Sequence, residues 1–186
     1  MDPLSDNELM LKVKAGDTGK LTLLYERHKG KLFGFFYRLT SNADLSEDLV
    51  QNVFYRLLKY RHTYSGEGKF LTWMYHMARN VNIDHFRKNK RMHYQEDMQE
   101  WEGKLKEEKG PDHQVSRSQE IDLLNQAMKR LKDDKREVLI LSKYQELKYE
   151  EIGKILEISV PAVKVRVHRA MNELKEIYLS LETSGL

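Results

Sequence analysis

Apolar residues recur at helical spacing along most of this chain, in two blocks that an acidic stretch separates. The blocks cover residues 6–86 and 120–181. Between residues 92 and 116 acidic side chains outnumber basic ones, which is typical of a flexible linker. Only 10 Gly and 3 Pro occur among 186 residues, and this favours helices over turn-rich sheets. The sequence therefore predicts an all-α fold of two small helical domains, over 1–91 and 117–186, joined by a flexible acidic linker over 92–116.

The composition excludes several classes of function. The chain has no cysteine, and therefore no disulfide framework, thiolate metal site or cysteine nucleophile. Its seven histidines form no close ligand pair, and Gly66-Glu67-Gly68 lacks the pattern of a phosphate-binding loop. We expect no cofactor, no metal and no enzymatic activity, although a catalytic group assembled only in space stays open at this stage. No apolar run reaches the roughly 18 residues of a membrane span, and the start lacks the features of a signal peptide, so we expect a cytoplasmic protein.

The second block contains the pattern of a helix-turn-helix. A short helix is predicted over 149–156, and Ser159 can cap a second helix that has Pro161 in its first turn and ends near Tyr178. Apolar residues at intervals of three and four leave the cations of this second helix on its exposed side. Such a helix can enter the major groove, where Arg and Lys reach guanine edges or phosphates. A plain helical hairpin with a solvated charged face is the alternative.

The first block contains a helix with one apolar and one polar face, which Asn42 can cap. On the polar face, Asp48, Gln51, Asn52 and Tyr55 are neighbours at offsets of three and four. The adjacent carboxylates of Glu47 and Asp48 diverge on a helix, so they do not form an acid-base pair. From the residues alone, a solvated polar face is the favoured interpretation.

Aromatic residues and cations surround a short loop later in the same block. Tyr64 precedes this loop, and Lys69, Phe70 and Trp73 follow it. A mobile loop beside aromatic rings suits capture of an unstacked base, although Phe70 and Trp73 are better explained as core residues. Farther on, residues 87–91 hold four cations in five positions, a density that suits phosphate contacts; a solvated helix end is the alternative.

Three groups of residues resemble segments of bacterial sigma factors of the extracytoplasmic-function type. Residues 47–54, Glu-Asp-Leu-Val-Gln-Asn-Val-Phe, resemble the segment that docks on the clamp coiled coil of RNA polymerase. Residues 70–75, 78–80 and 83–87 resemble the segment that melts and reads the −10 promoter element. Residues at fixed spacing between Leu131 and Ala170 resemble the domain that reads the −35 element. The segments occur in the order that the family has.

The chain departs from the family pattern at several positions. Lys148 stands where Ser usually caps a helix, at a cost of roughly 1 kcal/mol. Glu157 stands where Gly is frequent, and a left-handed backbone there would add about 1 kcal/mol of strain. Asn52 replaces a commoner acidic residue, Val165 a small polar residue and Met171 an Arg. These last changes bear on which groups are contacted rather than on the fold.

The resemblance implies an alternative sigma factor that binds core RNA polymerase and directs promoter-specific transcription initiation, without covalent chemistry of its own. The implied partners are core polymerase, through its clamp coiled coil and flap, promoter DNA and an anti-sigma factor. The implied polymerase-docking residues are Glu47, Asp48, Gln51, Asn52 and Tyr55. The implied −10 residues are Tyr64, Lys69, Phe70, Trp73, Asn80, Arg87, Lys88 and Arg91. The implied −35 residues are Ser159, Pro161, Ala162, Lys164, Val165, Arg166, His168 and Arg169.

A stand-alone helix-turn-helix regulator that binds a palindrome as a dimer is the alternative function. It would leave the polymerase-like docking face and the aromatic loop unexplained. Binding to polymerase distinguishes the two functions.

Overall fold

Helices build both halves of the protein. The computed structural model describes residues 4–96 and 117–184, with side chains for 4–88 and 119–183. The elements are α1 (Asp6–Lys14), α2 (Lys20–Thr40), α3 (Ala43–Lys59), a 3-10 turn (Arg61–Thr63), α4 (Phe70–Glu96), α5 (Arg117–Arg130), α6 (Asp133–Leu139), a π-helical turn (Ile140–Tyr144), α7 (Tyr149–Leu156) and α8 (Val160–Ser184). No strand occurs in the described ranges, so the all-α prediction is confirmed. None of the described helices is long and apolar enough to cross a membrane.

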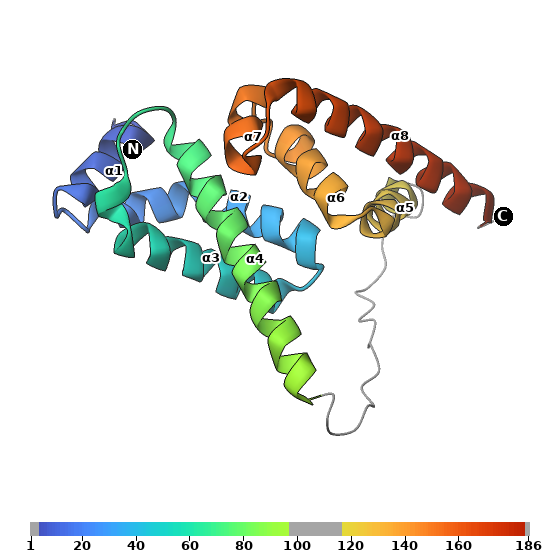
Figure 1. Ribbon diagram of the computed structural model, residues 1–186, viewed down its shortest axis with the longest axis horizontal. Coiled ribbons are helices and arrows are strands. Elements are labelled where there is room, and N and C mark those ends of the chain that lie inside the picture. Colours follow the sequence, from blue (N-terminus) through green and yellow to red (C-terminus); the bar gives the residue numbers. More distant parts are fainter. Residues whose placement is uncertain (1–3, 97–116, 185–186) are drawn as a thin grey trace.

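Helices α1 to α4 form the first domain (Figure 1). Helices α2, α3 and α4 pack on one another, and α1 lies against α2. Their apolar faces meet in a core in which Leu24, Phe35, Leu57 and Met74 are fully buried or nearly so. The predicted cap of α3 is confirmed, because Asn42 Oδ1 accepts a hydrogen bond of 2.9 Å from the backbone N–H of Leu45.

Helices α5 to α8 form the second domain, with the helix-turn-helix in α7 and α8. Ser159 Oγ accepts from Ala162 N at 3.3 Å and thereby caps α8 as predicted. A Cβ at Gly153 would lie 2.9 Å from the carbonyl oxygen of Ile158, so the turn between the two helices needs glycine there. Helix α8 runs to Ser184, beyond the predicted end near Tyr178, because no helix breaker occurs before Gly185.

The structure shows how the chain accommodates its two unusual turn residues. The side chain of Lys148 does not cap α7, but the Lys148 N–H donates to Glu151 Oε2 at 2.8 Å, which is half of a capping box. Glu157 has φ 57° and ψ 42°, the left-handed conformation that the comparison with glycine predicts.

The expected linker is shorter at its beginning than the sequence indicated. Helix α4 continues to Glu96, five residues past the predicted boundary at residue 91. The remainder of the expected linker, residues 97–116, lies outside the described residues.

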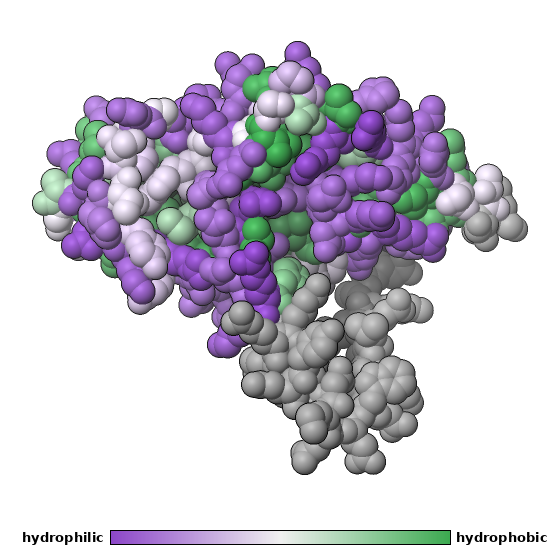
Figure 2. Space-filling model, in the orientation of Figure 1, coloured by the Kyte–Doolittle hydropathy of each residue, from purple (hydrophilic) through white to green (hydrophobic). Residues whose placement is uncertain are grey.

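The two domains pack against each other along α4. Helix α7 lies against α4, and α6 with its π-helical turn lies against α2 (Figure 1). Tyr75, which the sequence did not place on an inner face, is 1% exposed and donates to Gln145 Oε1 at 2.5 Å. Arg136 Nη1 donates to the carbonyl oxygen of Leu39 at 3.1 Å. The Arg38 guanidinium lies 4.2 Å from the centre of the Tyr144 ring. Hydrophilic side chains dominate the face of the two domains shown in Figure 2.

A buried histidine makes the stability of the first domain depend on pH. His28 is 5% exposed, and its Nε2 lies 2.7 Å from Asp6 Oδ2. Burial lowers the pKa of His28 below its ordinary value of 6.5, although Asp6 opposes this shift. Just below 6.5 the unfolded chain therefore binds more protons at this position than the native protein does. Stability is lost as the pH falls through that window.

We expect acidification from about pH 7.5 to about pH 5.5 to lower the Tm of the wild-type protein more than that of His28→Gln. Thermal unfolding followed by circular dichroism at several pH values measures the difference. Parallel Tm curves for the two proteins would show that His28 contributes nothing to the pH dependence.

Candidate nucleic-acid and protein interfaces

The polar face of α3 forms a continuous exposed surface. All five residues predicted to dock on polymerase lie on it with exposed side chains: Glu47, Asp48, Gln51, Asn52 and Tyr55. Behind them, Leu49, Val50 and Val53 are buried in the core. The helix thus holds this face outward on a fixed support.

Sequence reasoning missed the arginine that ties this face to α4. Arg56 Nε donates to Asn52 Oδ1 at 3.0 Å, and Arg56 Nη1 donates to Asp84 Oδ2 at 2.7 Å. The offset of four between Asn52 and Arg56 was a signal for the first contact. The second contact joins residues that are 28 positions apart and lie on two different helices, so residue spacing within one helix could not predict it. It gives Asp84 a structural role.

Three of the predicted −10 residues come together in one surface pocket of about 640 Å³. Trp73, Asn80 and Arg87 line it from α4, and Arg56 lines it from α3. Glu157 of the second domain also contributes to its wall. Aromatic, amide and guanidinium groups in one hollow can contact a base and the adjoining phosphates.

Two other predicted −10 residues lie inside the core. Tyr64 is 2% exposed and Phe70 is 1% exposed. Their rings pack edge to face at 6.3 Å, and Tyr64 lies 5.0 Å from Trp73. Neither Tyr64 nor Phe70 can stack on a base in this structure, because the aromatic cluster already covers both rings. This confirms the core position that the sequence favoured for Phe70, and it corrects the expectation of direct base contact for Tyr64.

The predicted cations lie at two places along α4. Lys69 is exposed just before the helix, and Arg87 and Lys88 are exposed on its later turns. Arg91 belongs to the same helix, but its side chain lies outside those that the structure describes. The predicted residues therefore extend along the helix rather than gathering at one point.

The predicted −35 residues occupy the outward side of α8. Seven of them are exposed: Ser159, Pro161, Ala162, Lys164, Val165, His168 and Arg169. Arg166 is half-buried. The opposite side of the helix packs into the domain through Val163, Val167 and Ala170. This geometry leaves the first turns of the helix free to enter a major groove.

Three pairs of polar side chains join the domains beside the predicted −10 residues. Lys69 Nζ lies 2.8 Å from Glu151 Oε1, and His76 Nε2 lies 3.2 Å from Glu157 Oε1. The third pair joins Arg79 Nε and Glu137 Oε1 at 3.3 Å. In each pair the first domain supplies the nitrogen and the second supplies the carboxylate. Sequence reasoning missed these pairs, because nothing in the sequence says which surfaces of the domains meet.

The carboxylates of these pairs differ in their electrostatic surroundings. Burial raises the pKa of Glu137 above its ordinary value, although Arg79 opposes the shift. Burial also acts to raise the pKa of Glu151, but hydrogen bonds from Lys69 and from the N–H of Lys148 outweigh it and leave that pKa lowered. Among the described side chains, no three His, Asp or Glu residues gather as a metal site.

Comparison with known proteins places both domains in one family. The model of sigma-70 region 2 matches residues 24–92, and that of sigma-70 region 4 matches residues 121–174. The RNA polymerase sigma factor YlaC of Bacillus subtilis is 31% identical over 154 residues, which cover 82% of this chain and 88% of that protein. The chain belongs to the sigma-70 family. The ECF RNA polymerase sigma factor SigW of Bacillus subtilis is 30% identical to this sigma factor over 181 residues, covering 91% and 97% of the two chains.

Solved structures share the fold of this sigma factor. CnrH, determined in complex with the cytosolic domain of CnrY, superposes with a TM-score of 0.71 at 18% identity over 94% of this chain and 97% of that one. RpoE of Bartonella quintana, determined with the anti-sigma factor NepR, gives a TM-score of 0.67 at 23% identity over 84% and 94%. The family models and the curated relatives give no support to a stand-alone dimeric regulator. Helix α1 precedes the segment that region 2 matches.

Proposed function

We propose that this sigma factor binds core RNA polymerase through the exposed face of α3 and directs it to promoters with a −10 and a −35 element. The first domain opens and reads the −10 element, and the second domain reads the −35 element with α8. The observation that supports this assignment is the presence on one chain of both family segments, in order, with the docking residues of α3 and most of the −35 residues of α8 on outward faces. The polymerase supplies the covalent chemistry, so this sigma factor is not an enzyme and acts in the cytoplasm, where core polymerase and promoters are found.

An anti-sigma factor is a further proposed partner. CnrH and RpoE of Bartonella quintana were each determined in complex with a second protein, which is named as an anti-sigma factor for RpoE. Their similarity to this sigma factor in fold supports a partner of the same kind, which would bind across the two domains.

The packed domains must separate before both elements are read. The −10 and −35 elements are roughly 25 base pairs apart, which is about 85 Å along B-form DNA. In the structure, however, α7 lies against α4, and Glu157 reaches the pocket that holds Trp73 and Asn80. Glu151 and Glu137 of the second domain pair with Lys69 and Arg79, two cations that would otherwise be free to contact phosphates. The packed arrangement is therefore the form without DNA.

Reconstitution tests the proposal. The purified chain is mixed with core RNA polymerase and a library of DNA duplexes, and run-off transcripts are sequenced. We expect a stoichiometric complex and a two-part consensus with a fixed spacing. A chain that leaves core polymerase unbound and instead selects a palindrome as a dimer would overturn the proposal.

We expect Arg87→Gln/Lys88→Gln to weaken promoter binding by the holoenzyme and to flatten its salt dependence. Each phosphate contact contributes about 0.9 to the slope of log K against log salt concentration, so losing both contacts lowers the slope by up to about 2. Filter binding between low and moderate salt measures the slope. Lys129→Gln/Lys175→Gln, which removes the same charge from exposed positions of the second domain, is the control. An unchanged slope in the first variant would exclude phosphate contact by these side chains.

A further inference from the structure

We propose that α1 positions the loop of residues 64–69, and that Asn7 is the residue through which it does so. This inference rests on the proposed function, in which the first domain reads the −10 element, and on the expectation from the sequence that this loop holds an unstacked base there. Helix α1 lies before residue 24, where the match to region 2 begins, so the matched segment does not include it and indicates no role for it.

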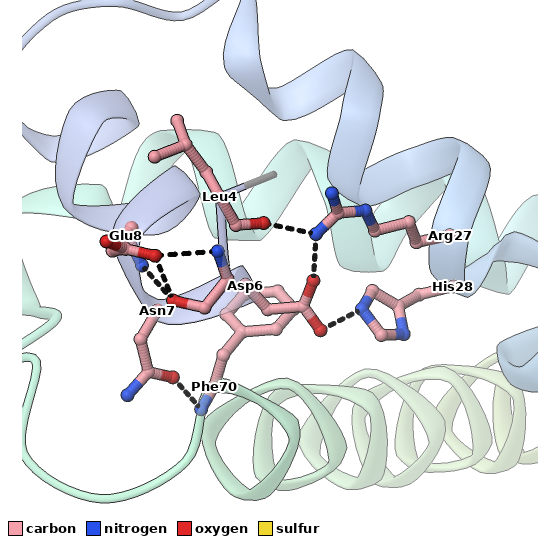
Figure 3. Close-up of polar contacts among 8 residues, drawn as sticks. Leu4, Asp6, Asn7, Glu8, Arg27, His28 and Phe70 are labelled. Carbon is pink, nitrogen blue, oxygen red and sulfur yellow. Dashed lines mark hydrogen bonds and ion pairs between the residues drawn. The ribbon is translucent and has the colours of Figure 1, made fainter. Parts of the chain in front are cut away.

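The side chain of Asn7 joins the end of the loop to the beginning of α4, and Figure 3 shows its contact with Phe70. Its Nδ2 donates to the carbonyl oxygen of Gly68 at 2.7 Å, and its Oδ1 accepts from the N–H of Phe70 at 2.7 Å. The first N–H groups of a helix need acceptors from outside the helix. The residue just before α4 is Lys69, whose ammonium group can only donate. Asn7 thus supplies from another helix the cap that the local sequence lacks.

The same side of α1 also contacts the start and the middle of the loop. Lys14 Nζ donates to the carbonyl oxygen of Tyr64 at 2.6 Å. A Cβ placed on Gly66 would lie 3.1 Å from Leu11 Cδ2, so Leu11 lies directly against the loop backbone. Asn7, Leu11 and Lys14 are four and three positions apart, which places them along one side of the helix. They meet the end, the middle and the beginning of the loop in turn.

Helix α1 is itself held firmly on the first domain. Leu9, Met10 and Val13 are fully buried. Asp6 Oδ1 accepts from Arg27 Nη1 at 2.8 Å, and the other carboxylate oxygen lies 2.7 Å from His28 Nε2 (Figure 3). Both partners belong to α2, so the contacts from α1 fix the loop relative to the core.

This support has a consequence for base capture. Gly66 and Gly68 both have φ +80°, and glycine loses more conformational freedom than other residues when its backbone is fixed. A loop that is already ordered does not have to lose that freedom when it encloses a base. Without the Asn7 contacts, the loop would hold its base less selectively, while the docking face of α3 and the outward side of α8 would be unchanged.

The test compares Asn7→Ala with Asn7→Asp in reconstituted holoenzyme. Asp keeps an acceptor for Phe70 N–H but loses the donor to Gly68. The readout is open-complex formation, by permanganate footprinting, on promoters that carry each of the four bases at every −10 and −35 position. We expect Asn7→Ala to lower the preference at one −10 position by about tenfold. Asn7→Asp should fall between Ala and wild type, and preferences at −35 should stay as in wild type.

Three further variants separate the possible failures and control for the substitution. Ser65→Gly/Glu67→Gly removes side chains from the loop and leaves Asn7 in place, so it identifies the −10 position that depends on the loop. If this variant alters no base preference, the assignment of the loop to base capture fails. If this variant does alter a base preference, Asn7→Ala should alter the same one. Should Asn7→Ala instead leave that preference intact, or weaken the preference at every position equally, the proposal that Asn7 positions the loop fails. Asn125→Ala, at an exposed site on α5, controls for the substitution, and Lys14→Gln tests the same support if Asn7→Ala does not fold.

Discussion

Replacing Asp48 and Gln51 together with alanine is expected to weaken binding of this sigma factor to core RNA polymerase by about 100-fold or more. Both side chains lie on the exposed face of α3, three positions apart, where they would contact one surface of a partner. A few central residues carry most of the energy of a protein interface, and a charged residue that loses its partner there costs several kcal/mol. Titration of labelled sigma factor with core polymerase measures the change.

The fold should survive this double substitution. Exposed side chains away from caps and buried networks change stability by only about ±0.5 kcal/mol, so Tm should stay close to that of the wild type. Asp122→Ala/Gln126→Ala is the matched control, because it removes the same two side-chain types from exposed positions on α5. Equal affinities of the two double variants for core polymerase would contradict the assignment of α3 as the docking helix.

The helices and their caps could be predicted because their causes are local. Asn42 and Ser159 cap α3 and α8 through contacts within three residues. The apolar residues of α8 that recur every three or four positions are the ones that the structure buries. The left-handed backbone at Glu157 was suggested by the resemblance, because Gly is frequent at this position in the family, and the structure shows it.

The parts that could not be predicted depend on contacts between distant segments. Tyr75 of α4 is buried, and the residue to which it donates, Gln145 of the second domain, is 70 positions away. Asn7 reaches Phe70 across 63 positions. The spacing of polar side chains along a helix does not indicate which residues they will contact. The spacing of apolar side chains does indicate which face of the helix is buried in the core. For the same reason Tyr64 suggested a base contact in the sequence, although the structure buries its side chain at the beginning of the loop.

The chemistry of the domain interface suits a contact that DNA can displace. Its two ion pairs, Lys69–Glu151 and Arg79–Glu137, and the His76–Glu157 contact each include at least one partly exposed group, and charged contacts open to solvent contribute little stability and weaken with salt. A phosphate backbone offers the cations of α4 a denser array of negative charge than three carboxylates do. We therefore expect binding of a promoter to replace the contacts between α4 and the second domain instead of adding to them.

Locking the domains together is expected to abolish promoter recognition. The chain has no cysteine, so His76→Cys/Glu157→Cys provides the only two thiols, at positions whose side chains are 3.2 Å apart in the wild-type protein. A short reducible bis-maleimide would join them. If, as we propose, DNA binds only the separated form, a lock that removes this form should reduce promoter-dependent transcription by about 100-fold or more. Reducing the cross-linker should restore it.

Comparison of the same variant before and after reduction removes any effect of the substitutions themselves. The single variants His76→Cys and Glu157→Cys, treated with the same reagent, show what attachment without a bridge does. Only the bridged protein should lose activity. If the bridged protein transcribed as well as the reduced protein, both promoter elements would have to be read while α7 stays against α4. The proposal that the spacing of about 85 Å between the elements requires domain separation would then be wrong. Recovery on reduction would instead establish that domain separation is a step of promoter binding.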